Sequence, residues 1–294
     1  MPPAGAVKIA VPNKGRLSEK TLETFAQAGV VMDDAVGERR LFATALNGQF
    51  AFLFVRAQDI PEYVHDGVAH AGVTGFDILR ESGKATTELL DLGFGHCKLV
   101  VAAPESSRVR SLRDVPAGAR VATSFPRLTA QFFRKARKRV RVVEVSGATE
   151  ITPQVGVADL VVDLTATGST LAINRLRPVA TVLESTARLV ANREALGDRR
   201  LGRQVRELAW ALQSVVAARG KRYVMANVPR RKVRQVAKVL PGISGPTIVE
   251  LGSRDDMVAA HAVVDETALY RVVNDLKALG AEGILVVPVT RLVG

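Results

Sequence analysis

The sequence predicts an α/β protein with largely parallel sheets, and three observations support this fold class. Short apolar segments alternate with helical stretches over the first two thirds of the chain. The last quarter has the order strand, helix, strand, strand, helix, strand, which is the pattern of a ferredoxin-like unit. The chain has 294 residues, of which 47% are hydrophobic and 24% charged, and these values are typical of a folded protein with two or three domains.

The strand predictions for the first part of the chain depend on short, mostly apolar runs. Such runs suit strands of a parallel sheet that is covered on both faces. The expected strands cover residues 8–11, 50–55, 71–74, 98–103, 120–123, 142–145 and 160–163. Helices are expected at residues 18–28, 59–66 and 128–137. The same reading predicts that the helix beginning near Leu171 continues beyond Ile173.

Two segments predict that the chain crosses between two lobes. The strand at 98–103 is followed by Pro104-Glu105-Ser106 and reads as a crossover, and residues 184–191 read as the return. We therefore expect a first lobe of residues 1–98 and 184–219 and a second lobe of residues 99–183. Two lobes joined by paired crossovers form a cleft, where ligands would bind.

A separate unit is expected from residue 220 to 294. A helix over 198–219 precedes it, because Val205, Leu208, Leu212 and Val215 recur at helical spacing before Gly220. The expected strands of this unit are 222–227, 247–251, 257–264 and 283–288, and its expected helices are 231–240 and 266–279.

The chain is strongly basic, with a formal charge of +12 and a pI of about 10.3, and basic residues crowd the segment 134–141. These features raise the question of nucleic-acid binding. Aromatic residues make up only 5% of the chain and are not interleaved with the charges, so the stacking platform expected for single strands is missing. We expect no nucleic-acid partner; the cluster is a solvated helix face or a field that attracts polyanionic substrates.

The cysteine and histidine content indicates neither a disulfide nor a transition-metal site. Cys97 is the single cysteine, which suits a reducing cytosol. The four histidines, His65, His70, His96 and His261, have no ligand spacing with one another or with Cys97. No secretory signal pattern and no apolar run near the ~20 residues of a spanning helix is found, so we expect a cytoplasmic protein without membrane contact.

The segment from Asp163 to Leu171 joins a buried-strand signal to a carboxylate and a hydroxyl-rich turn. Thr167, Gly168, Ser169 and Thr170 offer backbone NH groups and hydroxyls at a helix N-terminus, which favours a phosphate. Asp163 lies too far back for the same phosphate and suits the hydroxyls of a ribose. The alternative is an ordinary helix N-cap and a surface carboxylate.

Other polar side chains follow predicted strands, where open sheets carry their ligands. Lys14, Gly15 and Arg16 form one such turn, in which Gly15 permits a tight backbone, and Arg56 and Asp77 follow two further strands. Glu150 follows the turn Ser146-Gly147-Ala148-Thr149. The alternatives are a solvated charged turn for the cations, a helix cap for Asp77 and a first-turn helix acid for Glu150.

Four separated motifs resemble the ATP phosphoribosyltransferase family in its long form with a C-terminal histidine-binding domain. They are Val7 to Ser18, Gly72 to Leu79, Gly147 to Ile151 and Asp163 to Leu171. The resemblance implies a periplasmic-binding-protein-like core of two lobes. It also implies the first reaction of histidine biosynthesis, in which adenine N1 of ATP displaces pyrophosphate from phosphoribosyl pyrophosphate, with histidine as feedback inhibitor.

The resemblance also implies roles for these residues. The phosphoribosyl pyrophosphate set is Asp163, Thr165, Thr167, Gly168, Ser169, Thr170 and Glu150, and the set for ATP or pyrophosphate is Lys14, Gly15, Arg16, Arg56 and Asp77. No catalytic residue is assigned. Magnesium is the expected cofactor, held more through substrate phosphates and water than through side chains, and its protein ligands stay unassigned.

For the C-terminal unit, the resemblance implies a histidine sensor, and Thr247 and Ala281 are the candidate contacts. It also implies a homo-oligomer, usually a hexamer, with a dimeric form as the alternative. Two other functions are also compatible with the sequence. One is a two-lobed binding protein without chemistry, and the other is a basic protein associated with nucleic acid.

Overall fold

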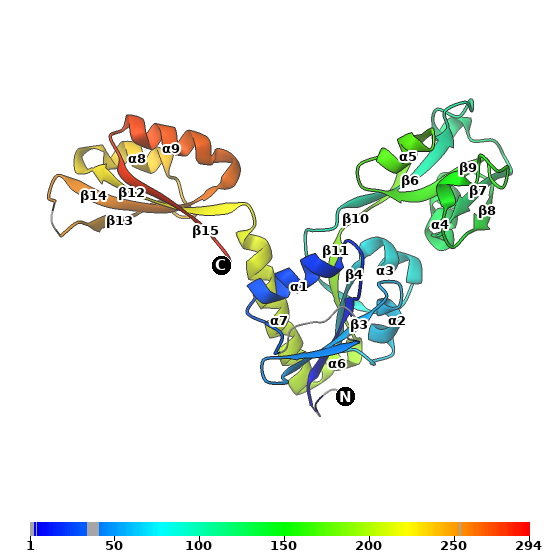
Figure 1. The fold of residues 1–294 in the computed structure, drawn as a ribbon, viewed down its shortest axis with the longest axis horizontal. Coiled ribbons are helices and arrows are strands. Elements are labelled where there is room, and N and C mark those ends of the chain that lie inside the picture. The colour runs from blue at the N-terminus through cyan, green and yellow to red at the C-terminus, as the bar shows by residue number, and fades with distance from the viewer. Residues whose placement is uncertain (1–2, 4, 34–40, 253) are drawn as a thin grey trace. The chain divides into compact units, whose positions relative to one another are not determined.

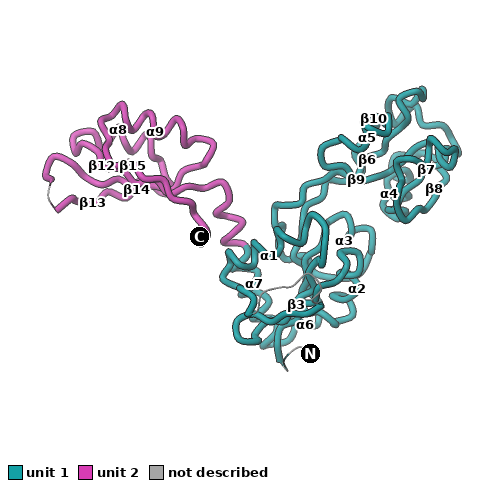
Figure 2. The backbone as a smooth tube through the Cα atoms, viewed as in Figure 1, with its two compact units in different colours: residues 1–212 teal, residues 213–294 magenta. Residues whose placement is uncertain are grey.

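The computed structural model describes residues 3, 5–33, 41–252 and 254–294. The chain divides into two compact units, Met1–Leu212 and Gln213–Gly294 (Figure 2). The boundary falls inside the long helix α7 (Arg199–Ala218), where Val205, Leu208, Leu212 and Val215 are all buried, as their spacing predicts. In the described part of the chain, no helix combines the length and the apolar character needed to cross a membrane.

The first lobe of the first unit is built on a six-stranded sheet of order β2-β3-β1-β4-β11-β5. Figure 1 labels β3, β4 and β11 of this sheet. The strands are β1 (Val7–Pro12), β2 (Phe42–Ala45), β3 (Phe50–Val55), β4 (Ala71–Gly75), β5 (Thr87–Asp91) and β11 (Ala187–Ala191). The helices are α1 (Ser18–Gln27), α2 (Ile60–His65), α3 (Phe76–Ser82) and α6 (Arg193–Gly197). Ala10, Ile60, Val64 and Val190 belong to one buried cluster, which fixes α2 against the sheet.

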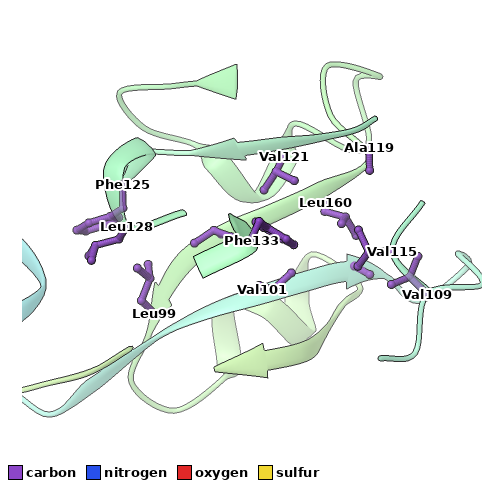
Figure 3. Close-up of a cluster of buried hydrophobic side chains, with 12 residues drawn as sticks. Leu99, Val101, Val109, Val115, Ala119, Val121, Phe125, Leu128, Phe133 and Leu160 are labelled. Carbon is purple, nitrogen blue, oxygen red and sulfur yellow. The ribbon is translucent and has the colours of Figure 1, made fainter. Parts of the chain in front are cut away.

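The second lobe is built on a five-stranded sheet of order β10-β6-β9-β7-β8. Its strands are β6 (Cys97–Pro104), β7 (Ala119–Thr123), β8 (Val140–Glu144), β9 (Leu160–Thr165) and β10 (Leu176–Ser185), and its helices are α4 (Pro126–Lys135) and α5 (Ser169–Ile173). Figure 3 shows its core, in which Phe133 of α4 lies among side chains of the sheet such as Val101 and Leu160. Phe133 is 1% exposed, so this aromatic ring anchors α4 to the sheet.

The chain crosses between these sheets twice. It leaves the first sheet after β5 and enters β6, and it returns from β10 into β11. Cys97 and Ser185 are register partners where β6 begins and β10 ends. The two connections therefore run side by side, and the fold is the two-lobed, periplasmic-binding-protein-like α/β arrangement.

The prediction of largely parallel sheets is wrong, because both sheets are mixed. β1 pairs in parallel with β3 and β4, and β7 pairs in parallel with β8 and β9. The strands next to the crossings pair antiparallel, as β11 does with β4 and β10 with β6. A chain that enters and leaves a lobe through adjacent strands must run in opposite directions in those strands. The alternation of strands and helices along the sequence does not reveal which strands are adjacent.

The prediction that the helix after Leu171 continues is also wrong. α5 ends at Ile173, and Arg175 adopts a left-handed φ of 53°. That conformation stops a right-handed helix. The next ten residues form β10 instead.

The second unit has the order β12 (Lys221–Pro229), α8 (Val233–Val239), β13 (Thr247–Glu250), β14 (Met257–Asp265), α9 (Leu269–Ala278) and β15 (Glu282–Pro288). The sheet has the order β13-β14-β12-β15, and all its described pairings are antiparallel. Val224, Val236, Leu240 and Leu276 are buried in one cluster, which seats both helices on the sheet. The predicted ferredoxin-like βαββαβ unit is confirmed.

Candidate active site

A cleft of about 800 Å³ lies in the first unit, with residues of both lobes in its walls. The first lobe contributes Asn13, Lys14, Gly15, Arg16, Leu17, Arg56, Ala57, Gln58, Asp59, Asp77, Ile78, Glu81 and Ser82, and the second contributes Ser124, Phe125, Glu144, Val145, Ser146 and Leu164. The lining residues come from the ends of β1, β3, β4, β7, β8 and β9 and from the segments that follow them. These strands make the parallel pairs of the two sheets, and the carboxyl ends of such strands are where open α/β sheets bind ligands.

Three cations of this cleft come from two neighbouring turns. Lys14 and Arg16 follow β1, and Arg56 follows β3, the parallel partner of β1. The NH of Asn13 donates to the carbonyl of Val55 at 2.9 Å, which holds the two turns together. Among the described residues, none forms an ion pair with these cations. Their charge is therefore available to an anionic ligand.

Gly15 shapes the turn that carries two of these cations. Its φ is +84°, and a Cβ at this position would meet no described atom within 4 Å. The glycine is therefore required by backbone conformation rather than by space. The following turn is tight, because the NH of Ser18 donates to the carbonyl of Gly15 at 3.0 Å where α1 begins.

Asp77 is a buried carboxylate in the first turn of α3, only 1% exposed. Its Oδ1 accepts a hydrogen bond from the Ser185 hydroxyl at 2.6 Å, and its backbone NH donates to the same hydroxyl at 3.0 Å. A Cβ on Gly75 would lie 2.2 Å from Oδ1, so this close approach needs a glycine. Asp77 Oδ2 is buried and has no hydrogen-bond partner among the described residues. A donor group of a ligand in the cleft would satisfy it.

The thiol of Cys97 contacts Arg16 and lies near Asp77 and Ser185. The guanidinium of Arg16 donates to Cys97 Sγ at 2.7 Å. Burial raises the pKa of the thiol, the charge of Asp77 raises it further, and the hydrogen bond from Arg16 opposes both effects. The net pKa is raised, so the thiol is protonated near neutral pH. A protonated thiol is a poor nucleophile, which leaves Cys97 a contact for Arg16 rather than a reactive group.

Asp163 and Glu150 are two acidic residues of the second lobe that influence each other. Burial raises the pKa of Asp163, and the nearby charge of Glu150 raises it further, while a hydrogen bond from the NH of Leu164 opposes the rise. Asp163 lies in β9, and Glu150 lies in a 3-10 turn, Thr149–Ile151, that follows Ala148 at a left-handed φ of 49°. The charge of Glu150 therefore acts on Asp163 in the folded protein.

The loop after Asp163 is an ordered, hydroxyl-rich turn. Gly168 has a φ of +84°, and its NH donates to Thr165 Oγ1 at 2.8 Å. The hydroxyls of Thr167 and Ser169 are hydrogen-bonded to each other at 2.9 Å. Because α5 has only five residues, its dipole adds little, and the affinity of this turn for an anion depends on its hydroxyls and backbone NH groups.

The two predicted residue sets differ in how many of their members line the cleft. Lys14, Gly15, Arg16, Arg56 and Asp77 all line the cleft. In β9, Leu164 lines the cleft, and Asp163 and Thr165 are its neighbours in the sequence. No member of the predicted phosphoribosyl pyrophosphate set is itself among the lining residues: Asp163, Thr165, Thr167, Gly168, Ser169, Thr170 and Glu150.

Several lining residues were not singled out from the sequence. Glu81, Ser124, Phe125 and Glu144 are polar or aromatic members of this group. Ser124 directly follows the predicted strand 120–123, so its place after a strand was a usable signal. Glu81 lies seven residues beyond the predicted strand 71–74, where no pattern marks it as part of a site.

The two effector candidates lie on opposite edges of the second unit's sheet. Thr247 begins β13 and is the register partner of His261 in β14. Ala281 directly precedes β15 and packs partly against the core of this unit. Strands β14 and β12 separate these edges. Within one copy, both residues therefore cannot touch one small ligand, since three strand spacings amount to about 14 Å.

Among residues 3, 5–33, 41–252 and 254–294, no group of three or more His, Cys, Asp or Glu side chains is arranged to hold a metal ion. A cation would therefore need ligands beyond these side chains. The pair Asp163 and Glu150 fits Mg²⁺ in this limited sense, because Mg²⁺ commonly takes one or two carboxylates and completes its shell with water and phosphate oxygens.

Fold and site together define a two-lobed α/β protein whose interlobe cleft contains Lys14, Arg16 and Arg56, followed by a ferredoxin-like unit. A family model described as ATP phosphoribosyltransferase matches residues 56–214, and one described as HisG, C-terminal domain, matches residues 218–291. The ATP phosphoribosyltransferase of Gemmatimonas aurantiaca is 52% identical over 98% of this chain and 99% of the relative. That of Methanocaldococcus jannaschii is 46% identical over 97% of this chain and 99% of the relative.

A solved structure gives the same result. The ATP phosphoribosyl transferase (HisG:HisZ) complex from Thermotoga maritima matches with a TM-score of 0.59 and 27% identity, over 70% of this chain and 98% of that chain. The chain belongs to the ATP phosphoribosyltransferase family, the transferases of histidine biosynthesis. The resemblance found in the four sequence motifs is confirmed.

Proposed function

We propose that this protein condenses ATP with phosphoribosyl pyrophosphate, forming phosphoribosyl-ATP and pyrophosphate. The observation that carries the proposal is the cleft whose lining includes Lys14, Arg16 and Arg56, three cations without an ion-pair partner among the described residues. Both substrates are polyanions, and their phosphates need such cations. The family membership of the chain supports the same reaction.

The reaction breaks the bond between ribose carbon-1 and the pyrophosphate oxygen and forms a bond from carbon-1 to adenine N1. The bonding electrons leave with pyrophosphate, so negative charge grows on the leaving group and positive charge on the sugar. In this proposal Lys14 and Arg16 stabilise the leaving pyrophosphate or the ATP triphosphate. Arg56 grips a phosphate or stacks on adenine. A strong base is not required, and alignment of the two substrates supplies much of the rate.

In this proposal the carboxylates bind the ribose and the nucleotide. Asp163 and Glu150 accept hydrogen bonds from the ribose hydroxyls, and the loop of Thr165, Thr167, Gly168, Ser169 and Thr170 holds the 5′-phosphate. Asp77 offers its unpartnered Oδ2 to a donor of the nucleotide, such as an adenine amino group or a ribose hydroxyl. When bound, magnesium would neutralise pyrophosphate charge, and Asp163 and Glu150 would face its hydration shell.

The test is product formation from ATP, phosphoribosyl pyrophosphate and magnesium, followed by the absorbance rise of phosphoribosyl-ATP with pyrophosphatase present. Omission of either substrate or of magnesium should abolish the rise. Binding of both substrates without any pyrophosphate release would instead favour a two-lobed binding protein without chemistry.

We further propose that the second unit senses histidine, that the enzyme acts in the cytoplasm and that it works as a homo-oligomer, a hexamer or a dimer. The opposite positions of Thr247 and Ala281 support a histidine site completed by a second copy, because one copy cannot bring both residues to one ligand. Histidine inhibits only if it binds two states of the assembly with different affinity. Replacing Thr247 with Ala should weaken inhibition by histidine and leave the uninhibited rate unchanged. Equal inhibition of both proteins would remove Thr247 from the sensor.

A further inference from the structure

Helix α4 begins in the second lobe without a cap of its own. Its N-cap residue is Phe125, which makes no side-chain capping bond, and Pro126 follows as the first helical residue. A phenyl ring offers no acceptor, so the NH groups of Arg127 and Leu128 would be left without the partner that Ser, Thr, Asp or Asn normally supplies.

A carboxylate of the first lobe supplies that partner. Glu81 Oε1 accepts a hydrogen bond from the NH of Arg127, and Oε2 accepts one from the NH of Leu128, both at 2.8 Å. These are the NH groups that an N-cap side chain satisfies, and they lie 46 and 47 residues further along the chain. The negative charge also lies at the positive end of the helix dipole. Glu81 therefore caps α4 from the other lobe.

A second close contact lies beside the first. Gly83 ends α3 at a left-handed φ of 64°, and a Cβ there would lie 2.0 Å from the Arg127 guanidinium. No larger residue fits between the end of α3 and the beginning of α4 while Arg127 holds this position. Glu81 and Phe125, on either side of the contact, both line the cleft.

We propose that Glu81 is an interlobe latch, a positioning residue whose bonds to α4 favour the lobe arrangement of this structure, called the closed arrangement below. Opening the cleft would withdraw Glu81 and leave two NH groups of α4 without their cap. The loss of a cap corresponds to roughly a tenfold shift of an equilibrium, so the latch biases the closed state by about that factor. Glu81 touches no reacting atom in this scheme. Closure does not depend on the proposed function; the kinetic consequence does.

The test compares the full-length protein with its Glu81→Ala and Glu81→Gln variants. Amide hydrogen exchange is followed over residues 126–130, and lobe separation is measured by pulsed dipolar spectroscopy between spin labels at Gln27→Cys and Lys135→Cys. Both label positions are exposed, on α1 and α4, and Cys97 is buried. Glu62→Ala is the matched control, since this first-lobe carboxylate pairs at 2.7 Å with Lys84 of the same lobe.

In Glu81→Ala, exchange of the α4 amides should be about tenfold faster and the label separation should grow. Glu81→Gln should lie between this variant and wild type, because its amide oxygen can still accept a bond from α4. Glu62→Ala should match wild type in both measurements. In the phosphoribosyltransferase assay, Glu81→Ala should raise KM for both substrates more than it lowers kcat, since saturating ligands close the lobes.

Unchanged exchange in Glu81→Ala would overturn the cap. Faster exchange with an unchanged label separation would overturn the latch, because the cap would then stabilise α4 alone. If Glu81→Ala does not fold, Glu81→Gln provides the same comparison. Both physical measurements are made without substrates, so an inactive wild-type protein would refute the proposed function and leave the latch to be judged on its own data.

Discussion

The hydroxyl of Ser185 donates a 2.6 Å hydrogen bond to Oδ1 of Asp77, across 108 residues of sequence. Asp77 lies in the first turn of α3 in the first lobe, and Ser185 ends β10, opposite Cys97 where the chain first enters the second lobe. Cys97 in turn accepts a hydrogen bond from Arg16. One carboxylate and one cation of the cleft are thus held by the paired connections between the lobes.

Replacing Ser185 with Ala should destabilise the protein by about 1–3 kcal/mol, because it leaves the buried Asp77 carboxylate without its hydrogen-bond donor. The free energy of unfolding in urea measures this change. Ser106→Ala is the control, since Ser106 is exposed, and it should stay within about 0.5 kcal/mol of wild type. Equal stabilities of the two variants would show that the Asp77 contact contributes nothing.

Replacing Asp163 with Asn should lower kcat/KM about 10- to 100-fold, because an amide oxygen is a weaker acceptor for ribose hydroxyls than a carboxylate. The same change should stabilise the protein at neutral pH. The pKa of Asp163 is raised in the folded state, first by burial, so the ionised carboxylate opposes folding above that pKa. The stability gain should therefore disappear as the pH falls below the ordinary value of 3.8.

Asp159→Asn is the control, and we expect its change in stability to have the opposite sign. The hydrogen bond from Arg120 lowers the pKa of Asp159, so its ionised form favours folding. This variant should be destabilised at neutral pH, and the loss should shrink as the pH falls through the lowered pKa. Stabilisation of both variants, or of neither, would contradict the account of the half-buried Asp163.

His70 should make stability sensitive to mild acid. Burial lowers its pKa, nearby Lys8 and Arg200 lower it further, and its Nδ1 accepts a hydrogen bond from the NH of Lys8 at 3.0 Å. Folding therefore favours the neutral form of His70. The contribution of this residue is complete above the ordinary value of 6.5 and is lost as the pH falls from there through the lowered pKa.

The unfolding free energy of His70→Gln should accordingly change less between pH 7.5 and pH 5.5 than that of wild type, which we would follow by urea titration. The exposed His96, changed to Gln, is the matched control and should leave the wild-type pH dependence intact. Parallel curves for wild type and His70→Gln would show that His70 is not the sensitive group.

The sequence predicts strands best where apolar residues are continuous. β1, β3, β4, β6, β7 and β9 lie where they were expected, because each is a short buried run. β10 was missed, since its pairing with β6 shifts register between Pro178 and Ala180 and again between Thr181 and Leu183. Each shift breaks the alternation of buried and exposed residues by which a half-buried strand is recognised.

The site likewise contains residues that the sequence could predict and contacts that it could not. Lys14, Arg16 and Arg56 were predictable, because each follows a strand whose apolar run is clear. The bond of Asp77 to Ser185 and the capping of α4 by Glu81 join residues 108 and 46 positions apart. Such contacts depend on how the two sheets are connected, and no local pattern encodes that connection.

In the proposed reaction, the cations of the interlobe cleft, rather than the basic surface in general, hold the pyrophosphate or triphosphate of the substrates. The most direct measurement is the rate of pyrophosphate release with ATP, phosphoribosyl pyrophosphate and magnesium in two charge-matched double variants. Lys14→Ala with Arg16→Ala removes two cations of the cleft, and Arg134→Ala with Lys135→Ala removes two exposed cations of α4.

We predict that the cleft variant loses at least about 100-fold in kcat/KM, since each charged contact to a phosphate contributes roughly 1.5–3 kcal/mol, and that the α4 variant stays within about threefold of wild type. Equal losses in the two variants would mean that net charge alone draws in the substrates. A cleft variant as active as wild type would place the reaction elsewhere and contradict the account.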